Sequence, residues 1–241
     1  MVGIRGGISI EDNDIRLGYF VVIKTEGTFG GVRQYDSSCG KSTTLGFEER
    51  GALNSPPRVL LNAVSALQSK HELTGSSIPS ILGAMCKNYP LMAKPRQGPG
   101  YVYQGAEDDR LFYPDYEHPI SKKNCSECDS AREVVRPERS DHDPYIHYGT
   151  IASGNEVIKD PRMRDLFLNC LCFETEAAGL MNDFPCLVIR GICDYCDSHK
   201  NDQWQRYAAA TAAAYAKELL LITDATDVRR TPEARTIMSE R

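Results

Sequence analysis

The sequence lacks any apolar run near the ~18 residues that a membrane-spanning helix requires. Its opening stretch, Met1–Gly7, contains no apolar segment of the kind found in secretory signal peptides. Basic residues are not in excess either. With 28 Lys and Arg against 33 Asp and Glu the net charge is −5, so bulk charge gives no support to nucleic-acid binding. We therefore expect an intracellular, cytoplasmic protein that binds neither a membrane nor nucleic acid.

A phosphate-binding P-loop is missing as well. The Gly-rich segment Thr25–Gly31 is not followed by the Gly-Lys-Ser/Thr triplet that ends such a loop. The stretch Gly40–Thr43 imitates that ending, but no glycine lies five residues before Gly40 and no buried strand leads into it. The glycines of the first segment are therefore interpreted as turn residues.

Cysteine usage gives no sign of a disulfide framework. The nine cysteines are an odd number, and five of them lie in apolar, strand-like runs. Such placement is typical of reduced, buried thiols in an intracellular protein. The five are Cys86, Cys170, Cys172, Cys186 and Cys193.

One further cysteine pair, Cys125 and Cys128, has the spacing of two metal ligands. A closed zinc site needs four ligands, and although His118, His142 and His147 lie nearby, the spacings match no standard zinc finger. A plain turn or a reversible dithiol is favoured over structural zinc, and we expect no metal and no cofactor.

Length and composition predict one folded domain. The chain has 241 residues, of which 41% are hydrophobic and 25% charged, as in ordinary globular proteins. Pro and Gly cluster after residue 94, and charged and Tyr-rich segments follow, so residues 94–145 are predicted to be a loop-rich insertion. Residues 223–241 are predicted to be a polar, frayed tail.

Hydrophobic periodicity predicts alternating strands and helices. Strands are expected over residues 2–4, 15–24 and 32–36, and over 146–152 before a Ser-Gly-Asn turn and a second short extended piece. Helices are expected after Pro56-Pro57, over 80–88, over 162–169, and over 202–221 with Asp202 as N-cap.

Two neighbouring segments near the C-terminal end carry acidic side chains. Phe173–Leu180 is typical of a strand that turns into a helix bearing Glu176. Cys186–Asp194 is typical of a buried strand that ends on Asp194. Because ligands of open α/β sheets bind where strands end, the two acids are expected at one cleft.

Four motifs occur in the order Ile4–Gly7, Gly149–Asn155, Phe173–Ala178 and Ile189–Asp197. In this order they resemble the nucleoside phosphorylase-I superfamily, which includes purine and uridine phosphorylases and methylthioadenosine/S-adenosylhomocysteine nucleosidases. The likeness covers residues 1–222 and is closest to the phosphorylase-like domains of fungal NLR-type proteins. It implies an α/β fold of three α/β/α layers with a central mixed, twisted sheet. It also implies strands before the Gly-Gly turn, so the first strands are expected to be missing.

The resemblance implies roles for individual residues. Asp194 would protonate the leaving base, Arg190 would orient that acid, and Glu176 would clamp the ribose hydroxyls. The structural alternative is that Glu176 is an acid favoured by a helix N-terminus and Asp194 a strand-end cap; as an ordered set, the site is favoured. The remaining implied substrate-binding residues are Glu174, Thr175, Ser153, Gly154, Asn155, Val157, Ile158, Gly6 and Gly7.

Two functions fit this resemblance. The first is cleavage of the N-glycosidic bond of a purine nucleoside or nucleotide, by water or with inorganic phosphate as co-substrate, in a homo-oligomer. For a nucleotide, Arg5 and Arg33 are candidate phosphate contacts. The second is a catalytically impaired nucleoside-binding module that regulates or scaffolds a larger signalling protein.

Overall fold

The computed structural model describes residues 1–37, 47–49, 53–121, 124–139 and 141–230. The Gly40–Thr43 stretch and the last eleven residues, 231–241, lie outside the described residues. No helix among the described residues is long and apolar enough to cross a membrane.

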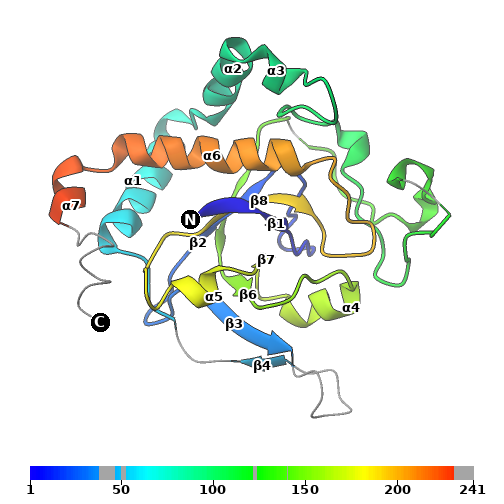
Figure 1. The fold of residues 1–241 in the computed structure, drawn as a ribbon, viewed down its shortest axis with the longest axis horizontal. Helices are drawn as coiled ribbons and strands as arrows, with labels where there is room; N and C mark the ends of the chain where they lie inside the picture. The colour runs from blue at the N-terminus through cyan, green and yellow to red at the C-terminus, as the bar shows by residue number, and fades with distance from the viewer. Residues whose placement is uncertain (38–46, 50–52, 122–123, 140, 231–241) are drawn as a thin grey trace.

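A mixed β-sheet of two four-stranded parts forms the centre of the molecule (Figure 1). In the first part β8 is central, parallel to β1 and antiparallel to β2, and β2 is parallel to β5. In the second part β3, β6 and β7 are parallel and β4 is antiparallel to β3. In sheet order the strands are β1 (Val2–Gly6), β8 (Ile189–Asp194), β2 (Phe20–Ile23) and β5 (Ile146–Gly149), then β4 (Phe47–Glu49), β3 (Val32–Ser37), β6 (Ile151–Ser153) and β7 (Cys172–Glu174).

The two parts are joined by backbone hydrogen bonds. Thr150 alone separates β5 from β6, and the Lys24 N–H donates to the Gly149 carbonyl at 3.1 Å. At the end of β1, Gly7 forms an isolated bridge with Cys172, and the Ile8 N–H donates to the Leu171 carbonyl at 2.9 Å. The ends of β1 and β8 therefore lie beside β7, which leads to Glu176.

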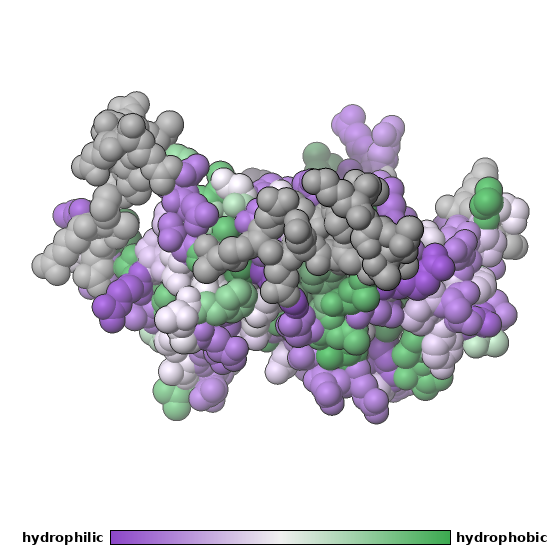
Figure 2. All heavy atoms as spheres, turned by 90° about the horizontal axis from the view of Figure 1, so that it is seen from below, coloured by the Kyte–Doolittle hydropathy of each residue, from purple (hydrophilic) through white to green (hydrophobic). Residues whose placement is uncertain are grey.

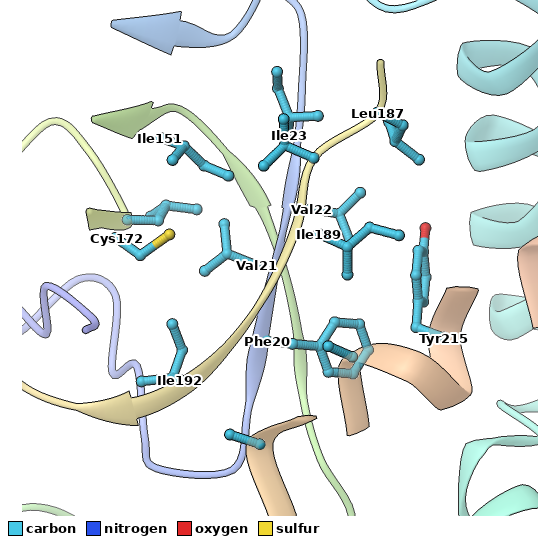
Figure 3. Packing of buried hydrophobic residues seen from close by; sticks show 14 of the residues in the cluster. Phe20, Val21, Val22, Ile23, Ile151, Cys172, Leu187, Ile189, Ile192 and Tyr215 are labelled. Atoms are coloured by element: carbon cyan, nitrogen blue, oxygen red, sulfur yellow. The ribbon is translucent and has the colours of Figure 1, made fainter. Parts of the chain in front are cut away.

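Helices pack against the first part of the sheet. The helix α6 contacts β1, β8 and β2, and α1 and α2 contact α6 on its other side (Figure 1). The buried residues of α6 include Tyr207, Thr211 and Tyr215, which lie on one face of the helix. The rings of Tyr215 and Phe20 pack together with their centroids 5.1 Å apart (Figure 3). The helices are α1 (Arg58–Thr74), α2 (Ile78–Asn88), α3 (Pro90–Ala93), α4 (Pro161–Arg164), α5 (Ala177–Leu180), α6 (Gln205–Ile222) and α7 (Ala225–Arg230).

We expect Gly191→Ala to destabilise the fold, because Gly191 of β8 lies directly under α6. A Cβ at this position would overlap the backbone carbonyl of Ala208, which cannot move without shifting the helix. Overpacking of this kind costs about 1–3 kcal/mol. Urea unfolding of both proteins measures the change in the free energy of unfolding.

The control is Gly83→Ala in α2, where a Cβ would meet open space. This change should leave stability unchanged or raise it by about 0.5–1 kcal/mol, since Ala is the better helix former. Equal effects of the two substitutions would contradict the packing argument.

The sequence correctly predicted a mixed-sheet α/β fold, while several details differ. The expected helix over 162–169 is the short α4 followed by a 3₁₀ turn at Asp165–Phe167. The strand expected over 15–24 is confined to β2, and residues 154–160 form no strand. Part of the expected tail is the helix α7.

The predicted insertion, residues 94–145, is irregular in its described part. It contains three 3₁₀ turns, at Ala106–Asp108, Cys125–Glu127 and Ser130–Arg132. Its buried Asp109 accepts hydrogen bonds from Arg139 at 2.6 Å and from the Leu17 N–H at 3.2 Å, and it also binds the Tyr195 hydroxyl. The hydrogen bonds of Asp109 to Leu17 and Tyr195 hold the insertion beside the end of β8.

The face at the bottom of Figure 1 carries hydrophobic atoms among hydrophilic ones (Figure 2). Leu166, Leu168 and Leu180 are among the exposed large apolar side chains of the described residues. The homo-oligomer expected from the sequence stays a prediction.

Candidate active site

A buried ion pair supports the end of β7. Glu174 is fully buried, and its Oε2 lies 2.9 Å from Nη2 of Arg190 on β8. The Glu174 carboxylate also accepts backbone N–H groups of Glu176 and Ala177, each at 2.9 Å. Gly3 of β1 leaves room for this pair, since a Cβ there would overlap the Arg190 guanidinium. Glu174, predicted to bind substrate, thus lies behind the turn that carries Glu176.

Glu176 is the exposed member of the same network. Its side chain is 45% exposed, and its Oε2 lies 2.7 Å from Arg190 Nη2. The other oxygen, Oε1, accepts the Thr175 hydroxyl at 2.9 Å and pairs with Arg5 of β1. Partial burial raises the pKa of Glu176, but the Thr175 hydrogen bond and the charges of Arg190 and Arg5 outweigh it, so the pKa lies below its usual value. The side chain is therefore a carboxylate at neutral pH.

Asp194 lies at the end of β8 and is 5% exposed. Its Oδ1 accepts the Cys196 N–H at 3.0 Å, and its Oδ2 pairs with the ammonium group of Lys200. Burial lowers the pKa of Lys200, but the charge and hydrogen bond of Asp194 raise it more, so Lys200 is protonated. Asp194 also borders a cavity of about 20 Å³, room for one water molecule.

The prediction that Arg190 orients Asp194 is wrong. Arg190 donates its side-chain hydrogen bonds to Glu174 and Glu176. The two residues are four positions apart on one strand, a separation of about 13 Å along its axis. Lys200 holds Asp194 instead, and the sequence analysis missed it because nothing in the motif required the loop after β8 to fold back.

The two acids flank consecutive residues of β1. Arg5 binds Glu176, whereas Gly6 lies against Asp194, and a Cβ on Gly6 would overlap Asp194 Oδ1. Gly7 then pairs with Cys172 at the start of β7. The end of β1 thus contacts both acids, which are eighteen positions apart in the chain.

The predicted base-binding segment supports the turn at Glu176. Ser153 is fully buried and its hydroxyl accepts the Ala178 N–H at 2.9 Å, while the Gly154 N–H donates to the Glu174 carbonyl at 3.1 Å. The Tyr35 ring packs so closely on Gly154 that a Cβ would overlap it. Farther along, Asn155 is exposed, Val157 is 54% exposed, and Ile158 is buried in the cluster around Tyr35.

The two candidate phosphate ligands have partners within the protein. Arg5 binds Thr175 and Glu176, and Arg33 on β3 donates to the Asn169 side chain at 2.7 Å. A second acid near Asp194 was not selected from the sequence. Asp197 is buried and borders the same small cavity, and burial raises its pKa to about 6.

Comparison with known proteins gives sequence relatives but no matching protein-family model. The chain is 41% identical over 230 residues to a nucleotide-binding leucine-rich repeat (NLR)-like protein of Hyaloscypha variabilis, which covers 92% of this chain and 21% of that protein. It is 36% identical over 84 residues to the ATP nucleosidase Cap17 of Escherichia coli, which covers 31% of this chain and 17% of that protein. The chain therefore spans about a fifth of the length of these relatives.

Solved structures with partial similarity include a 5′-methylthioadenosine/S-adenosylhomocysteine nucleosidase of Neisseria meningitidis, with a TM-score of 0.44, 14% identity, and coverage of 91% of this chain and 67% of that one. The futalosine hydrolase of Helicobacter pylori has a TM-score of 0.40 and 14% identity, with coverage of 91% and 65%. The sequence relatives confirm the resemblance to NLR-type proteins and to nucleosidases.

Proposed function

We propose that this chain cleaves the N-glycosidic bond of a purine nucleoside or nucleotide, with Glu176 binding the ribose and Asp194 protonating the base. The observation that supports this most is the convergence of the two acids on the end of β1, where Arg5 meets Glu176 and Gly6 meets Asp194. Breaking the bond leaves positive charge on the sugar and negative charge on the base. One carboxylate and one proton donor, both at the end of β1, match those two charges.

Glu176 fits the sugar side of this reaction. It is ionised, half exposed, and fixed by Arg190 and Thr175. A carboxylate has about four acceptor positions. Three on Glu176 are taken by Thr175, Arg5 and Arg190, so the two vicinal ribose hydroxyls bind once Arg5 or Thr175 leaves Oε1. Because the buried Glu174 holds Arg190 from the other side, the carboxylate is positioned before substrate binds.

Asp194 fits the base side once Lys200 leaves it. In the structure the Lys200 ammonium pairs with Oδ2. A purine that enters against Oδ2 would take the place of Lys200 and exclude water from the carboxyl group. Asp194 would take up a proton from the departing Lys200 ammonium and pass it to the purine nitrogen as the bond to the sugar breaks.

We expect Glu176→Gln to lower base release by about 10²-fold or more, because the amide provides no negative charge to the cationic transition state. The protein is incubated with adenosine, inosine and ATP, with and without inorganic phosphate, and free base is measured by chromatography. ATP belongs in this set because one relative is named an ATP nucleosidase. A requirement for phosphate would identify phosphorolysis.

Glu72→Gln is the matched control, because Glu72 is exposed on α1. This substitution should leave base release unchanged. Base release from none of the three substrates by the folded parent protein would contradict the enzyme proposal. So would equal activity of the Glu176→Gln protein.

The second candidate is a nucleoside-binding regulatory module. It is favoured by the observation that both acids are already paired with cations, Glu176 with Arg5 and Asp194 with Lys200. Calorimetric binding of a nucleoside without base release, and its loss in Glu176→Gln, would select this function.

A further inference from the structure

Three metal-ligand side chains meet within the insertion. The ligand atoms of His118, Cys125 and Cys128 all lie within 4.8 Å of one another. A tetrahedral zinc ion, with Zn–S about 2.3 Å and Zn–N about 2.0–2.1 Å, sets its ligand atoms about 3.3–3.8 Å apart. Small side-chain adjustments therefore suffice to bring these three atoms onto one ion.

The backbone around the two cysteines is held in the turn that such a pair requires. The Cys128 N–H donates to the Cys125 carbonyl at 3.0 Å, and the Asn124 side chain accepts the Ser126 N–H at 3.2 Å. The Arg110 guanidinium donates to the carbonyls of Cys125 and Cys128, the latter at 3.1 Å. Arg110 thereby holds the backbone carbonyls of both cysteines in place.

A buried histidine faces this cluster without a hydrogen-bond partner. The His199 side chain is 4% exposed, and among the described residues neither ring nitrogen makes a hydrogen bond. The nearest carboxylate oxygen, on Asp197, is 3.9 Å from Nδ1. The ring stacks on Phe112 at 4.1 Å between centroids and lies 5.3 Å from the His118 ring. Leaving such a polar group unpaired inside a protein is costly, and a metal ion on one nitrogen would remove that cost.

We propose that His118, Cys125 and Cys128 bind a zinc ion with His199 as the fourth ligand. Two thiolates and two imidazoles make a closed tetrahedral site, which is structural rather than catalytic. Asn201 supports the ligands from outside: its side-chain N–H donates to the Cys125 sulfur at 3.7 Å and to the His199 carbonyl at 3.1 Å.

The ion would join the insertion to the loop after β8. His118 and the cysteines belong to the insertion, while His199 directly precedes Lys200, the partner of Asp194. The His118 N–H also donates to the Ser198 hydroxyl at 2.9 Å, so the two segments already touch. Zinc binding would thus fix the loop that carries Lys200, whether or not the chain cleaves a glycosidic bond.

The first test measures metal on the whole 241-residue chain, purified under reducing conditions without a chelator or a histidine tag. We expect about one zinc per chain by mass spectrometry of the metal, as for a closed four-ligand site. Replacing zinc with Co(II) should give the visible bands of tetrahedral cobalt and a thiolate-to-metal charge-transfer band. A folded protein that carries no zinc and develops neither band on Co(II) addition would overturn the proposal. So would a Cys125–Cys128 disulfide as the stable form of the folded protein under these conditions.

Variants then assign the ligands. Cys125→Ser, Cys128→Ser and His118→Ala should each weaken Co(II) binding, and the charge-transfer band should fall in the two serine variants. Cys86→Ser removes a half-buried thiol of α2 that is not in the cluster and should leave metal content and spectrum unchanged. In His199→Gln the charge-transfer band should remain, because both thiolates are kept. The affinity for Co(II) should fall by about 10-fold or more, as expected when a metal site loses a contact. Unchanged affinity and d–d bands in His199→Gln would exclude it as the fourth ligand.

Discussion

Replacing Asp194 with Asn should lower kcat/KM for base release by about 10²-fold or more, because an amide has no acidic proton to give to the purine. The side chain keeps its size at the end of β8, and its oxygen can still accept the Cys196 N–H. Folding should therefore persist, although Lys200 loses its ion pair. The comparison uses whichever of adenosine, inosine and ATP the parent protein cleaves best, with circular dichroism to confirm the fold.

Asp197→Asn is the control that tests whether Asp194, and not its neighbouring acid, donates the proton. Asp197 is a second buried acid at the same small cavity, and with a pKa of about 6 it holds a proton more readily than an ordinary carboxyl. Its Oδ1 accepts the backbone N–H of His199 at 2.9 Å, so Asp197 stabilises the loop after β8. We expect its substitution to lower activity less than that of Asp194. The reverse result would make Asp197 the proton donor and contradict the assignment to Asp194.

The elements that carry the two acids could be predicted because they depend on short-range patterns. Apolar runs located β7 and β8, and each run ends next to an acid that it carries to the sheet edge. The order of the motifs then predicts a shared site for Glu176, Asp194 and the Gly6-Gly7 turn, and that shared site stays a prediction. The alternative reading of Glu176 as a helix N-terminal acid also describes it, since it is the N-cap residue of α5, although its side chain makes no capping hydrogen bond.

Partners that come from long-range folding could not be predicted. Lys200 reaches Asp194 because the chain reverses after β8, at Cys196, which adopts φ 55°. A cysteine is rarely found in this left-handed region, so no residue preference indicated the turn. Arg5 was assigned to a substrate phosphate, yet the register of β1 beside β8 places it against Glu176.

Helix boundaries were missed for a related reason. Asp202 has the side chain of a good N-cap, but α6 begins at Gln205 with Trp204 as its N-cap. Trp204 is buried and its indole N–H donates to the Asp108 carbonyl at 3.1 Å. Packing against the insertion therefore determines where this helix starts, and this contact cannot be predicted from the sequence of the helix alone.

Arg190→Met should lower the free energy of unfolding by about 3–5 kcal/mol, because it leaves the buried Glu174 carboxylate without its counter-ion. Methionine fills much of the same volume, so the loss reports the charge rather than a cavity. The backbone N–H groups of Glu176 and Ala177 remain bonded to Glu174 but do not supply a full positive charge. Urea unfolding measures the effect, and base release should fall with it, since Glu176 loses the same guanidinium.

A double variant separates the two consequences. Adding Glu174→Gln to Arg190→Met removes the uncompensated charge, so part of the lost stability should return, and the cycle gives the coupling energy of the pair. Base release should not recover, because Glu176 still lacks Arg190. Recovery of activity together with stability would show that Arg190 acts on the fold alone. A single Arg190→Met variant as stable as the parent would mean that the Glu174–Arg190 pair does not support the turn that holds Glu176.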